Sequence, residues 1–417
     1  MADFTDDARA DEADVSERIE RYADELRAAG AIRSPQAERA FRTVQRHRML
    51  EAFYYHDAAG RVTVHHDPGH PRRDHLELIY ADTALATRYI GGWPASSTSQ
   101  ASLVARMLEL LNLRPGMKVL EVGAGTGYNA ALMAEIVGDQ RLVVTVDVLE
   151  DVVDQTARLL AAAGYPGIRV LWRDGFAGVP AEAPFDRIVA TVGCSDLSPH
   201  WAGQLADGGV MLVPLEHVDG HPLVLVGQHD GVLRGRVVLW TGFMPVRGPL
   251  QMSGEGMADG LWSRGMVMAD PGDVVHEPDQ EPRFGPPRPD EPHVSGDAES
   301  DFLFFLGLAD RRACSAPQGV GLSSGLDGWA TVASDGIRWW KDAALAAELD
   351  RHYRDWDARG RPSVGEYLVS FLPIGTEGDP PPGGWQIKRR FYRELVTLGV
   401  RPDGTQGTGA RTQDRSG

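Results

Sequence analysis

The sequence predicts an α/β protein: a parallel sheet with helices on both faces, helices before that sheet and a smaller α/β unit after it. Between Lys118 and Phe243, short Val/Ile/Leu runs alternate with helical stretches, which is the rhythm of βαβ units. From Asp270 to Asp301 the chain is rich in Pro, Asp and Glu and nearly lacks aliphatic residues, which predicts a linker or long surface loop. The length of 417 residues also exceeds what one core usually holds.

Local patterns place the individual elements. Apolar residues at helical spacing predict an amphipathic helix from Val15 to Gly30, and Ser34-Pro35 predicts the start of a second helix. The first four apolar runs of the sheet are each followed by a turn and a helical stretch. A later pair of runs flanks Asp230-Gly231, which predicts an antiparallel hairpin at the end of the sheet. The predicted strands are Lys118–Gly123, Leu142–Val148, Ile168–Arg173, Arg187–Val192, Val210–Leu215, Leu223–Gly227 and Val237–Phe243.

A second α/β unit is predicted beyond the linker. It contains the apolar run Phe302–Leu308, a helical pattern over Ala343–Arg359 and a strand pattern over Tyr367–Pro373. A basic run that includes Arg389 is interpreted as a solvated face, with contact to an acidic peptide as the alternative. Five tryptophans are interpreted as core residues, with a peptide-binding face as the alternative. These residues are Lys388, Arg389, Arg390 and Arg393, and Trp329, Trp339, Trp340, Trp356 and Trp385.

Composition and charge narrow the partners and the compartment. A net charge of -17 and a pI near 5.2 disfavour phosphate backbones and anionic lipid surfaces, so neither nucleic acid nor a membrane is expected as a partner. No apolar run is long enough to span a bilayer, and Met1–Glu20 lacks the pattern of a secretory signal, so a cytoplasmic location is expected. Cys194 and Cys314 are too far apart and too few for a disulfide framework or a zinc site.

A glycine-rich turn is the first candidate site. Gly123, Gly125 and Gly127 follow Glu121 where a predicted strand turns into a helix, a place where backbone N–H groups face a ligand. The dinucleotide pattern GxGxxG would need glycine at the position of Tyr128, and no P-loop lysine follows. The turn therefore favours S-adenosylmethionine as the cofactor, with a purely structural strand-to-helix turn as the alternative.

Two acids follow the next two predicted strands. Asp147 lies where a carboxylate meets ribose hydroxyls in nucleotide-binding α/β folds. Asp174 is expected to accept a hydrogen bond from the adenine amino group, and Gly175 to leave room for the ring. The alternative is that both aspartates only cap helices. Because all three strand ends lie at the carboxyl edge of one sheet, a cofactor site is the favoured interpretation.

From Ala23 to Phe243 the chain resembles the protein L-isoaspartyl O-methyltransferases. The resemblance implies a Rossmann-like class I S-adenosylmethionine-dependent methyltransferase fold. In that family a Thr-Ile-Ser-x-Pro segment carries the serine that contacts the substrate carboxylate, which by position is Ser99. This chain has Ser97-Thr98-Ser99-Gln100-Ala101, without the isoleucine and the proline. The matching segments are Leu26–Gly30, Arg46-His47, Ser96–Gln100, Val119–Tyr128, Pro184–Asp186, Thr191 and Gly208-Gly209.

The resemblance implies a domain division and site roles. Residues 1–14 are expected to be an acidic tail, 15–250 the catalytic domain, 251–300 the linker, 301–400 an accessory domain that recognises substrate, and 401–417 a disordered tail. Ser99 is the expected catalytic residue, and Thr98, Ser99, Val192 and Gly193 are the expected substrate-binding residues. The alternative for Ser99 is a helix N-cap for Leu103–Leu111.

The chemistry of carboxyl methylation fits these residues. A carboxylate has a pKa near 4 and is ionised at neutral pH, so alignment matters more than a strong base. The C-terminal extension resembles that of a bacterial subgroup that methylates an aspartate in a macrocyclised ribosomal precursor peptide, so that the ester closes to an aspartimide. General repair of isoaspartyl proteins, methylation of a small molecule or nucleic acid, and non-catalytic cofactor binding are the alternatives.

A metal site is not expected. Five histidines lie between residues 56 and 75, but they are separated by Pro, Gly and Arg and form no i, i+4 pair on a predicted helix. They are His56, His65, His66, His70 and His75.

Overall fold

The computed structural model describes residues 9–57, 60–251, 283–284, 297–316, 319–333, 336–376 and 380–399. They divide into two compact units. The first unit contains the chain up to Val192 together with Ser198–Val213 and Met244–Pro249. The second contains Gly193–Leu197, Pro214–Phe243 and the chain from Leu250 onward. The predicted C-terminal tail and most of the predicted linker and N-terminal tail lie outside the described residues.

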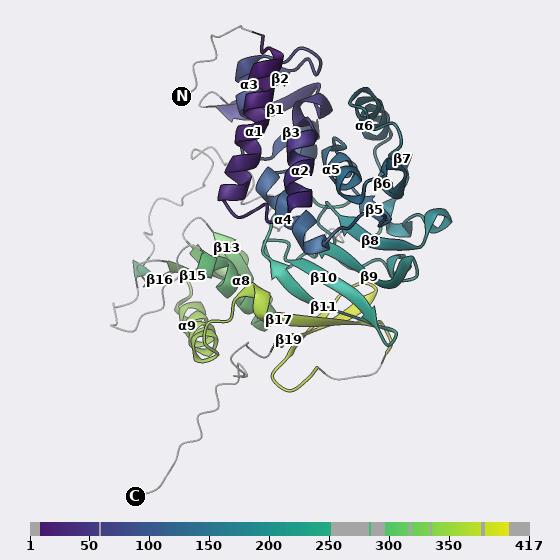
Figure 1. The fold of residues 1–417 in the computed structure, drawn as a ribbon. Coiled ribbons are helices and arrows are strands. Elements are labelled where there is room, and N and C mark those ends of the chain that lie inside the picture. Colours follow the sequence, from purple (N-terminus) through teal and green to yellow (C-terminus); the bar gives the residue numbers. More distant parts are fainter. Residues whose placement is uncertain are drawn as a thin grey trace, which may run out of the picture. The chain divides into compact units, whose positions relative to one another are not determined.

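A parallel sheet forms the centre of the first unit (Figure 1), and its strands lie in the order β9-β8-β5-β6-β7. In the middle strand, Val119 is paired with Val143 on one side and with Arg187 on the other. This arrangement confirms the predicted parallel sheet. The strands are β5 (Val119–Val122), β6 (Val143–Asp147), β7 (Arg169–Trp172), β8 (Phe185–Ala190) and β9 (Leu205–Pro214).

The connections after these strands differ in length. Helix α5 (Tyr128–Val137) follows β5 and is buried on almost every side, and α6 (Glu150–Ala162) follows β6. The prediction of a helix after the third apolar run is wrong, because only two 3₁₀ turns follow β7, Gly175–Ala177 and Pro180–Glu182. Gly178, with φ +60°, interrupts the chain between them. The helix after β8, α7 (Pro199–Ala202), has a single turn.

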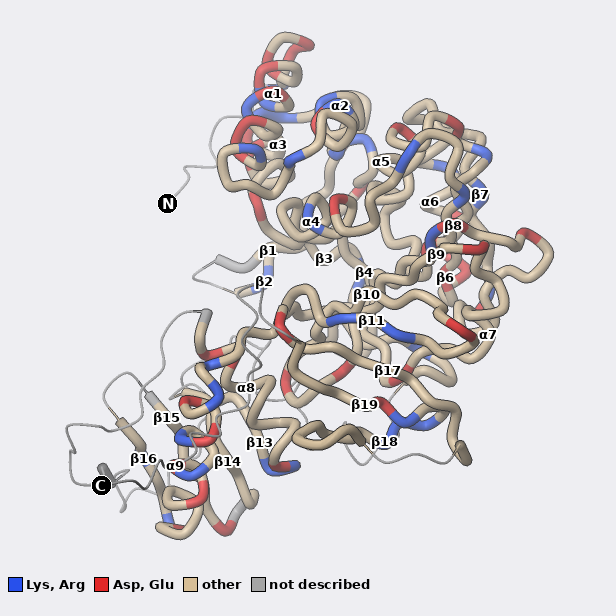
Figure 2. Tube along the Cα trace, turned by 60° about the horizontal axis from the view of Figure 1, so that its bottom comes forward, with Lys and Arg blue, Asp and Glu red and all other residues tan. Residues whose placement is uncertain are grey.

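Two helices precede the sheet. Helix α1 (Glu12–Ala28) begins three residues before the predicted start, because Asp11 and Asp14 form a capping box around its first turn. Helix α2 (Pro35–Thr43) begins at the predicted proline, capped by Ser34. Figure 2 shows acidic and basic residues close together on both helices, where Arg42 forms ion pairs with Glu20, Asp24 and Glu38. Helix α2 packs on α5 and so connects this layer to the sheet.

A small antiparallel sheet between α2 and β5 was not predicted. Its order is β2-β1-β3-β4, and its last strand leads directly into α4 (Ala101–Leu111). It therefore determines where the chain reaches Ser99. The elements are the 3₁₀ turn Arg46–Met49, β1 (Ala52–Asp57), β2 (Gly60–His65), α3 (Arg73–Ile79), β3 (Leu85–Ile90) and β4 (Trp93–Thr98).

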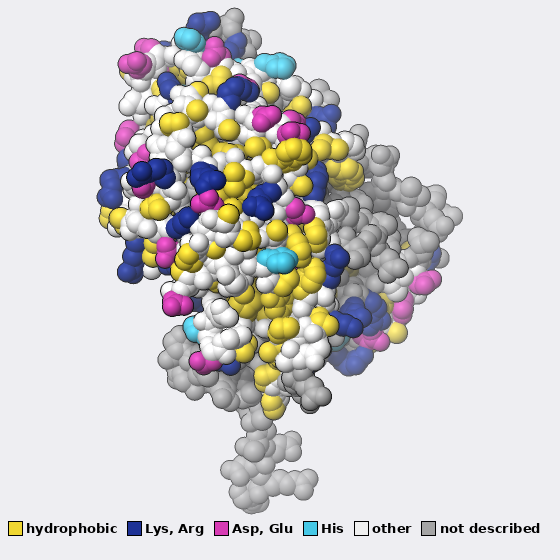
Figure 3. Space-filling model, turned by 90° about the vertical axis from the view of Figure 1, so that its right-hand side faces the viewer, with side chains coloured by type: hydrophobic (Ala, Val, Ile, Leu, Met, Phe, Trp, Pro, Cys, Tyr) yellow, Lys and Arg dark blue, Asp and Glu magenta, His cyan; other side chains and the backbone are white. Residues whose placement is uncertain are grey.

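Charges of both signs are mixed on the molecular surface. On the face drawn in Figure 3, Lys and Arg side chains alternate with Asp and Glu side chains, with hydrophobic groups between them. The net charge of -17 is therefore not gathered into one acidic patch on that face.

The second unit contains an antiparallel sheet in the order β10-β11-β17-β19-β18. The predicted hairpin is confirmed: β10 and β11 are joined at Asp230 and Gly231, with φ values of 51° and 76°. Strand β11 then pairs with β17, which lies much later in the chain. The strands are β10 (Leu223–His229), β11 (Val232–Leu239), β17 (Tyr367–Pro373), β18 (Trp385–Lys388) and β19 (Tyr392–Leu398).

A second antiparallel sheet of this unit packs on two helices. The apolar run Phe302–Leu308 lies in α8 (Asp297–Ala309), and α9 (Ala343–Ala358) occupies almost the predicted range. Trp356 is buried in their common core, and Trp339 and Trp385 pack against it, so the core interpretation holds for these three tryptophans. The strands are β12 (Arg283–Phe284), β16 (Gly336–Trp340), β15 (Trp329–Ala333), β14 (Gly319–Ser323) and β13 (Ala313–Ala316), in sheet order.

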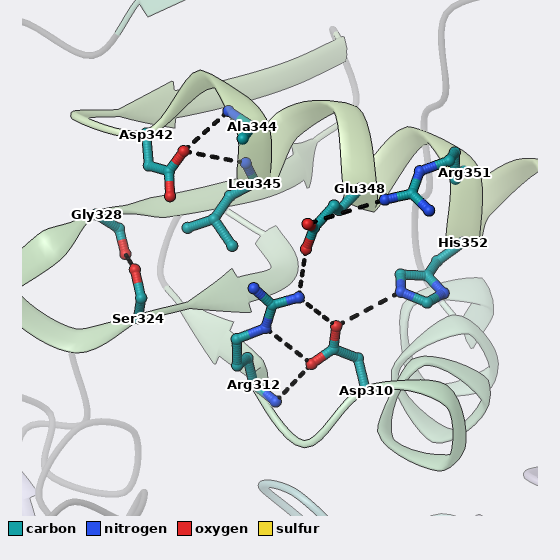
Figure 4. Close-up of polar contacts among 10 residues, drawn as sticks. All are labelled: Asp310, Arg312, Ser324, Gly328, Asp342, Ala344, Leu345, Glu348, Arg351 and His352. Carbon is teal, nitrogen blue, oxygen red and sulfur yellow. Dashed lines mark hydrogen bonds and ion pairs between the residues drawn. The ribbon is translucent and has the colours of Figure 1, made fainter.

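A polar cluster connects the end of α8 with α9 (Figure 4). The Asp310 carboxylate accepts hydrogen bonds from the backbone and the guanidinium of Arg312, and Arg312 also forms an ion pair with Glu348 on α9. Nε2 of His352 lies 3.5 Å from the same Asp310 carboxylate. The hydrogen bonds from Arg312 hold the pKa of Asp310 down to about 2. The turn after α8 is thereby fixed against α9 by charged groups.

Candidate active site

The glycine turn between β5 and α5 is shaped by left-handed backbone conformations. Gly123, Gly125 and Gly127 have φ values of 106°, 53° and 81°. A Cβ on Gly123 would lie 2.6 Å from Oγ1 of Thr191 and 3.1 Å from Cγ1 of Val192. The Thr191 hydroxyl itself lies 2.7 Å from the carbonyl oxygen of Gly123. The turn at the end of β5 is thus held by the end of β8.

The other two glycines are required by close packing. A Cβ on Gly125 would lie 3.0 Å from the carbonyl oxygen of Ser97, which belongs to β4. A Cβ on Gly127 would lie 2.9 Å from side-chain carbons of Thr156 and Leu160 on α6. The Thr156 hydroxyl also donates to the carbonyl oxygen of Gly125 at 2.6 Å. These contacts bring β4 and α6 to opposite ends of the glycine turn.

Glu121 is a buried carboxyl group directly before the turn. Its side chain accepts a hydrogen bond from Nδ2 of Asn129 on α5 at 2.7 Å. Burial raises the pKa of Glu121 to about 7. Its second oxygen, Oε2, is buried and has no hydrogen-bond partner among the described residues. A ligand that brings a donor group would satisfy this oxygen.

Asp147 lies at the end of β6, beside the glycine turn. Its Oδ2 is 3.4 Å from the backbone nitrogen of Gly125, and its Oδ1 accepts a hydrogen bond from the backbone nitrogen of Leu149 at 3.1 Å. The carboxylate therefore combines a turn-capping contact with a position next to the predicted cofactor loop. The helix-cap alternative is wrong for Asp147, because α6 begins behind Leu149 and has no side-chain capping bond. The ribose role stays a prediction.

Asp174 and Gly175 follow β7, and both have structural contacts of their own. Oδ1 of Asp174 accepts from the backbone nitrogen of Phe176 at 2.9 Å, as expected of a cap. A Cβ on Gly175 would lie 2.3 Å from Cγ1 of Val122, so close packing on β5 requires this glycine. A Cβ on Gly248 would lie 2.4 Å from Oδ2 of Asp174, which places a second chain segment beside the carboxylate. The adenine-binding roles of Asp174 and Gly175 stay predictions.

Ser99 lies between β4 and α4, and it is not the cap of α4. The N-cap residue is Gln100, whose side chain makes no capping bond, and Asp82 instead accepts from the backbone nitrogen of Ser102 at 2.8 Å. The backbone carbonyl of Ser99 accepts a hydrogen bond from the buried guanidinium of Arg46 at 2.9 Å. The half-buried Ser99 side chain is thus attached to a fixed backbone, and its hydroxyl is not used for capping.

The remaining predicted substrate residues are partly or fully buried. Thr98 is 2% exposed, and its hydroxyl has no hydrogen-bond partner within the described part of the chain. Val192 lies beside Gly123, as described above. Gly193, the next residue, is buried, and a Cβ there would lie 2.1 Å from Nε2 of His221. A substrate-binding role for these residues stays a prediction.

Several supporting residues were not found from the sequence. Asn129, Thr156 and Asp82 contact the site through partners 8 to 31 residues away along the chain, and Asp82 lies 20 residues before its partner. No local pattern marks such contacts. Arg46 belongs to a matching family segment, and this is the signal that pointed to it.

The described residues do not form a metal, reactive-thiol or membrane-spanning site. No group of three or more metal-ligating side chains occurs among the residues that the structure describes. Of the five histidines, His66 lies 3.3 Å from His75 between their Nδ1 atoms, and Nε2 of His66 lies 3.0 Å from the carbonyl oxygen of His47. Burial raises the pKa of the Cys194 thiol far above its usual range, which leaves the thiol unreactive. None of the described helices is long and apolar enough to cross a membrane.

The donor and acceptor pattern of the site fits S-adenosylmethionine. Glu121, Asp147 and Asp174 supply carboxylate oxygens around a glycine turn, and this ligand carries an ammonium group, ribose hydroxyls and an adenine amino group as donors. Oε2 of Glu121, which has no hydrogen-bond partner among the described residues, is an acceptor suited to such a donor. Acidic side chains at a glycine turn do not suit a diphosphate.

Comparison with known proteins places this site in context. The family model of protein-L-isoaspartate(D-aspartate) O-methyltransferases matches residues 17–251. The protein-L-isoaspartate O-methyltransferase of Thermotoga maritima is 37% identical over 177 residues, which are 42% of this chain and 56% of that protein. That of Methanopyrus kandleri is 35% identical over 231 residues, which are 55% of this chain and 91% of that protein. A solved protein-L-isoaspartate O-methyltransferase structure has a TM-score of 0.50 at 24% identity, and covers 84% of this chain and 96% of its own.

The fold and the glycine turn define a class I S-adenosylmethionine-dependent methyltransferase. More specifically, the chain belongs to the protein-L-isoaspartate(D-aspartate) O-methyltransferase family. It is accordingly a protein carboxyl O-methyltransferase with S-adenosylmethionine as its cofactor. Since the structural match covers more of the chain than the family model does, the likeness in fold extends beyond residue 251.

Proposed function

We propose that this chain transfers a methyl group from S-adenosylmethionine to the carboxylate of an aspartyl or isoaspartyl residue in a peptide. The observation that carries the proposal is the approach of the Ser99 segment to the glycine turn. The carbonyl of Ser97 lies at the position that a side chain on Gly125 would need. The chain thus contacts the cofactor loop at Ser97, two residues before the Ser99 hydroxyl that is suited to bind a carboxylate.

The reaction makes few chemical demands on the protein. Bound S-adenosylmethionine supplies an electrophilic methyl group. The acceptor carboxylate is ionised at neutral pH, so no strong general base is required. Ser99 would donate a hydrogen bond to one carboxylate oxygen and leave the other free to attack. Arg46 contributes by holding the Ser99 backbone, because alignment of the attacking oxygen supplies much of the rate in such a step.

The cofactor roles follow the positions of the three acids. Asp147 would accept hydrogen bonds from the ribose hydroxyls, and Asp174 from the adenine amino group. Glu121 and the glycine turn would hold the methionine part, whose ammonium group is a donor for the unpartnered Glu121 oxygen. Each of these assignments is part of the proposal.

As the dedicated substrate we propose an aspartate in a macrocyclised ribosomal precursor peptide. After methylation, the backbone nitrogen of the following residue would attack the ester carbonyl and expel methanol, which closes an aspartimide. The segment Ser97–Ala101 supports this, because it departs from the family's Thr-Ile-Ser-x-Pro pattern at the residues next to Ser99.

General repair of isoaspartyl proteins is the second candidate. The relatives of Thermotoga and Methanopyrus are named protein-L-isoaspartate O-methyltransferases, and the fold of a solved enzyme of that name matches 84% of this chain. The C-terminal region alone therefore does not separate repair from dedicated biosynthesis. A cofactor-binding protein without turnover is the candidate of another class.

Mass spectrometry of turnover separates these candidates. The full chain is incubated with S-adenosylmethionine and, in parallel, a linear isoaspartyl peptide and a macrocyclised precursor peptide from the same gene neighbourhood. A methyl ester followed by net loss of one water from the precursor, with little action on the linear peptide, supports the dedicated role. Turnover of the linear peptide alone supports repair. Cofactor binding without turnover of either peptide contradicts both enzymatic candidates.

The Ser99→Ala variant tests the catalytic residue. Loss of one hydrogen bond to a charged group should lower kcat/KM for the accepted peptide by about ten- to a hundredfold. The affinity for S-adenosylhomocysteine, measured by calorimetry, should stay within about twofold, because Ser99 is not assigned to the cofactor. Ser102→Ala, one turn into α4, is the matched control and should keep wild-type kinetics. Full activity of Ser99→Ala would remove this serine from the mechanism.

A further inference from the structure

The segment that follows β8 is held by residues from two later parts of the chain. Backbone hydrogen bonds join it to Pro214, Glu216 and Leu250, and further hydrogen bonds join it to residues near the C-terminal end. Gly193–Leu197, here called the post-β8 segment, comes directly after Val192. Asp196 in this segment is fully buried. Its Oδ2 accepts hydrogen bonds from the backbone nitrogens of Phe391 at 2.5 Å and Tyr392 at 3.1 Å. Asp196 thus binds the backbone at the point where β19 begins.

Arg389 makes a second attachment. Its Nη1 donates to the backbone carbonyl of Ser195 at 2.8 Å and to that of Glu216 at 3.0 Å. The same guanidinium forms an ion pair with Glu394 at 2.6 Å, and the two side chains are only 6% and 4% exposed. The interpretation of this basic run as a solvated face is therefore wrong for Arg389. Its neighbour Lys388 is exposed, as that interpretation expected.

The His221 side chain packs directly against Gly193, the first residue of the segment. Because a Cβ on Gly193 would lie 2.1 Å from Nε2 of His221, the imidazole fills the space that a side chain would use. His221 is itself fixed, since its Nδ1 accepts a hydrogen bond from the backbone nitrogen of Phe243 at 3.2 Å. Burial lowers its pKa to about 4, so the ring is neutral at physiological pH. The backbone near the start of the segment is held by hydrogen bonds of Cys194 to the backbones of Pro214 and Glu216.

A buried ion pair of this kind is not explained by stability alone. Removing two charges from water is costly, and an apolar pair of similar size is often at least as stable. Arg389 instead donates a directed hydrogen bond to the backbone of a loop, and Glu394 holds the guanidinium in place for it. The loop continues into Val192, whose side chain lies beside Gly123 of the cofactor turn.

We infer that Arg389 and Asp196 are positioning residues for the substrate-binding loop Val192–Gly193, and that they act through the backbone of the post-β8 segment. The inference rests on the proposed function of that loop. It implies that residues beyond the family-matched region, 17–251, fix the backbone that directly follows Val192.

Two sets of variants of the full chain test this inference. Arg389→Leu combined with Glu394→Leu replaces both members of the ion pair by apolar groups, so that neither is left as the unpaired half of it. Asp196→Ala removes the acceptors for three backbone N–H groups, those of Leu197, Phe391 and Tyr392, and Asp196→Asn keeps one oxygen acceptor. Lys388→Gln changes an exposed charge in the same basic run and is the matched control.

We expect the variants to weaken binding of the peptide and to leave binding of the cofactor product nearly unchanged. The double variant and Asp196→Ala should raise KM for the accepted peptide about tenfold, while the dissociation constant of S-adenosylhomocysteine changes by less than about threefold. Asp196→Asn should recover most of the loss, and Lys388→Gln should behave as the wild type. Unchanged KM and kcat in folded variants, verified by their thermal unfolding, would overturn the inference.

Hydrogen–deuterium exchange distinguishes this outcome from failure of the proposed function. Amides of residues 191–197 should exchange faster in the double variant and in Asp196→Ala than in the wild type, with or without turnover. If the wild type methylates neither peptide, the proposed function fails and exchange alone decides whether Arg389 and Asp196 fix the loop. Unchanged exchange in this segment would contradict the positioning role directly.

Discussion

Asp147 serves two partners with one carboxylate. One oxygen caps the turn that leads into α6, and the other lies beside the backbone nitrogen of Gly125. The sequence suggested helix capping and ribose binding as alternatives. Helix α6 has no side-chain cap, and Asp147 instead accepts from the backbone nitrogen of Leu149 just before it. Capping directs one oxygen toward Leu149, and the position at the edge of the sheet leaves the other for the ligand side.

The Asp147→Asn variant separates the two roles. Asparagine caps turns about as well as aspartate, so stability should change little, whereas an amide group replaces the second carboxylate oxygen. We expect the affinity for S-adenosylhomocysteine, measured by calorimetry, to fall at least about tenfold. Asp139→Asn, which changes another turn-capping aspartate of the same unit, should leave the affinity unchanged. Equal affinities in both variants would refute the ribose assignment.

Glycines illustrate what sequence can and cannot establish at this scale. The Gly123–Gly127 turn was predicted from the spacing of its glycines. In the structure each of these glycines has a positive φ, which other residues rarely adopt. Gly175 also follows a strand end, yet its missing side chain is explained by the Val122 side chain at 2.3 Å. Packing contacts between separate strands leave no local pattern, so this distinction required the structure.

Among the elements, α4 shows how the site is supported from outside. The helix has no capping side chain of its own at Gln100, and Asp82 accepts hydrogen bonds from the Ser102 backbone and from the Gln100 side chain. Asp82 lies just before β3, so the small antiparallel sheet and α4 are joined at the point where the chain passes Ser99. The orientation of α4 therefore depends on a residue from another element.

The Asp82→Ala variant should destabilise the first unit by about 1 kcal/mol, the usual cost of a lost N-cap. Asp82→Asn should cost less, since asparagine also accepts these hydrogen bonds. The measurement is the midpoint of the denaturant-induced transition, followed for both variants and the wild type. Equal midpoints for Asp82→Ala and the wild type would mean that another group caps α4.

Elements with local signals were predictable, and those defined by distant partners were not. The strands of the parallel sheet and the β10–β11 hairpin carry apolar runs and a turn dipeptide in the sequence itself. The sheet β2-β1-β3-β4 was missed because its strands are mostly half-exposed, without the buried runs that mark β5 and β6. Likewise, nothing near Arg389 indicates that it contacts Ser195, 194 residues away.

In the molecule as a whole, buried titratable groups affect stability in opposite directions. Burial lowers the pKa of His47 to about 3 and the pKa values of His66, His217 and His221 to about 4. Between about pH 4 and pH 6.5 the unfolded chain binds protons that the folded chain excludes. These four histidines therefore cost stability as the pH falls below about 6.5.

Two carboxyl groups act in the other direction. Burial raises the pKa values of Glu121 and Glu216 to about 7, so the folded chain keeps protons that the unfolded chain releases above about pH 4.5. Their contribution is lost as the pH rises toward 7. Four histidines outweigh two carboxyls below about pH 6.5, and the carboxyls alone act from there to about pH 7. The thermal midpoint should therefore be highest near about pH 6.5.

Scanning calorimetry between pH 5 and pH 8 checks this maximum. His217→Gln keeps a donor for the carbonyl of Phe304 but no longer titrates, so the loss of stability on the acid side should become shallower. Glu216→Gln should flatten the alkaline side in the same way. His70→Gln makes the same substitution at an exposed histidine and is the control for the effect of the exchange itself on the midpoint. A midpoint that is constant over the whole range would contradict the assignment of these groups.

The pairing of β11 with β17 has a consequence for how the chain is made. Leu233 is paired with Phe371, and Arg236 with Leu368, so the hairpin β10–β11 leaves the ribosome long before its neighbour in the sheet. Because synthesis adds roughly 5–20 residues per second, the edge of β11 stays unpaired for on the order of 10 s before β17 has been made. An open strand edge is a template for pairing with other chains. A nascent chain that ends near residue 251, where the family match ends, keeps that edge exposed, and folding of the second unit is completed only when β17 arrives.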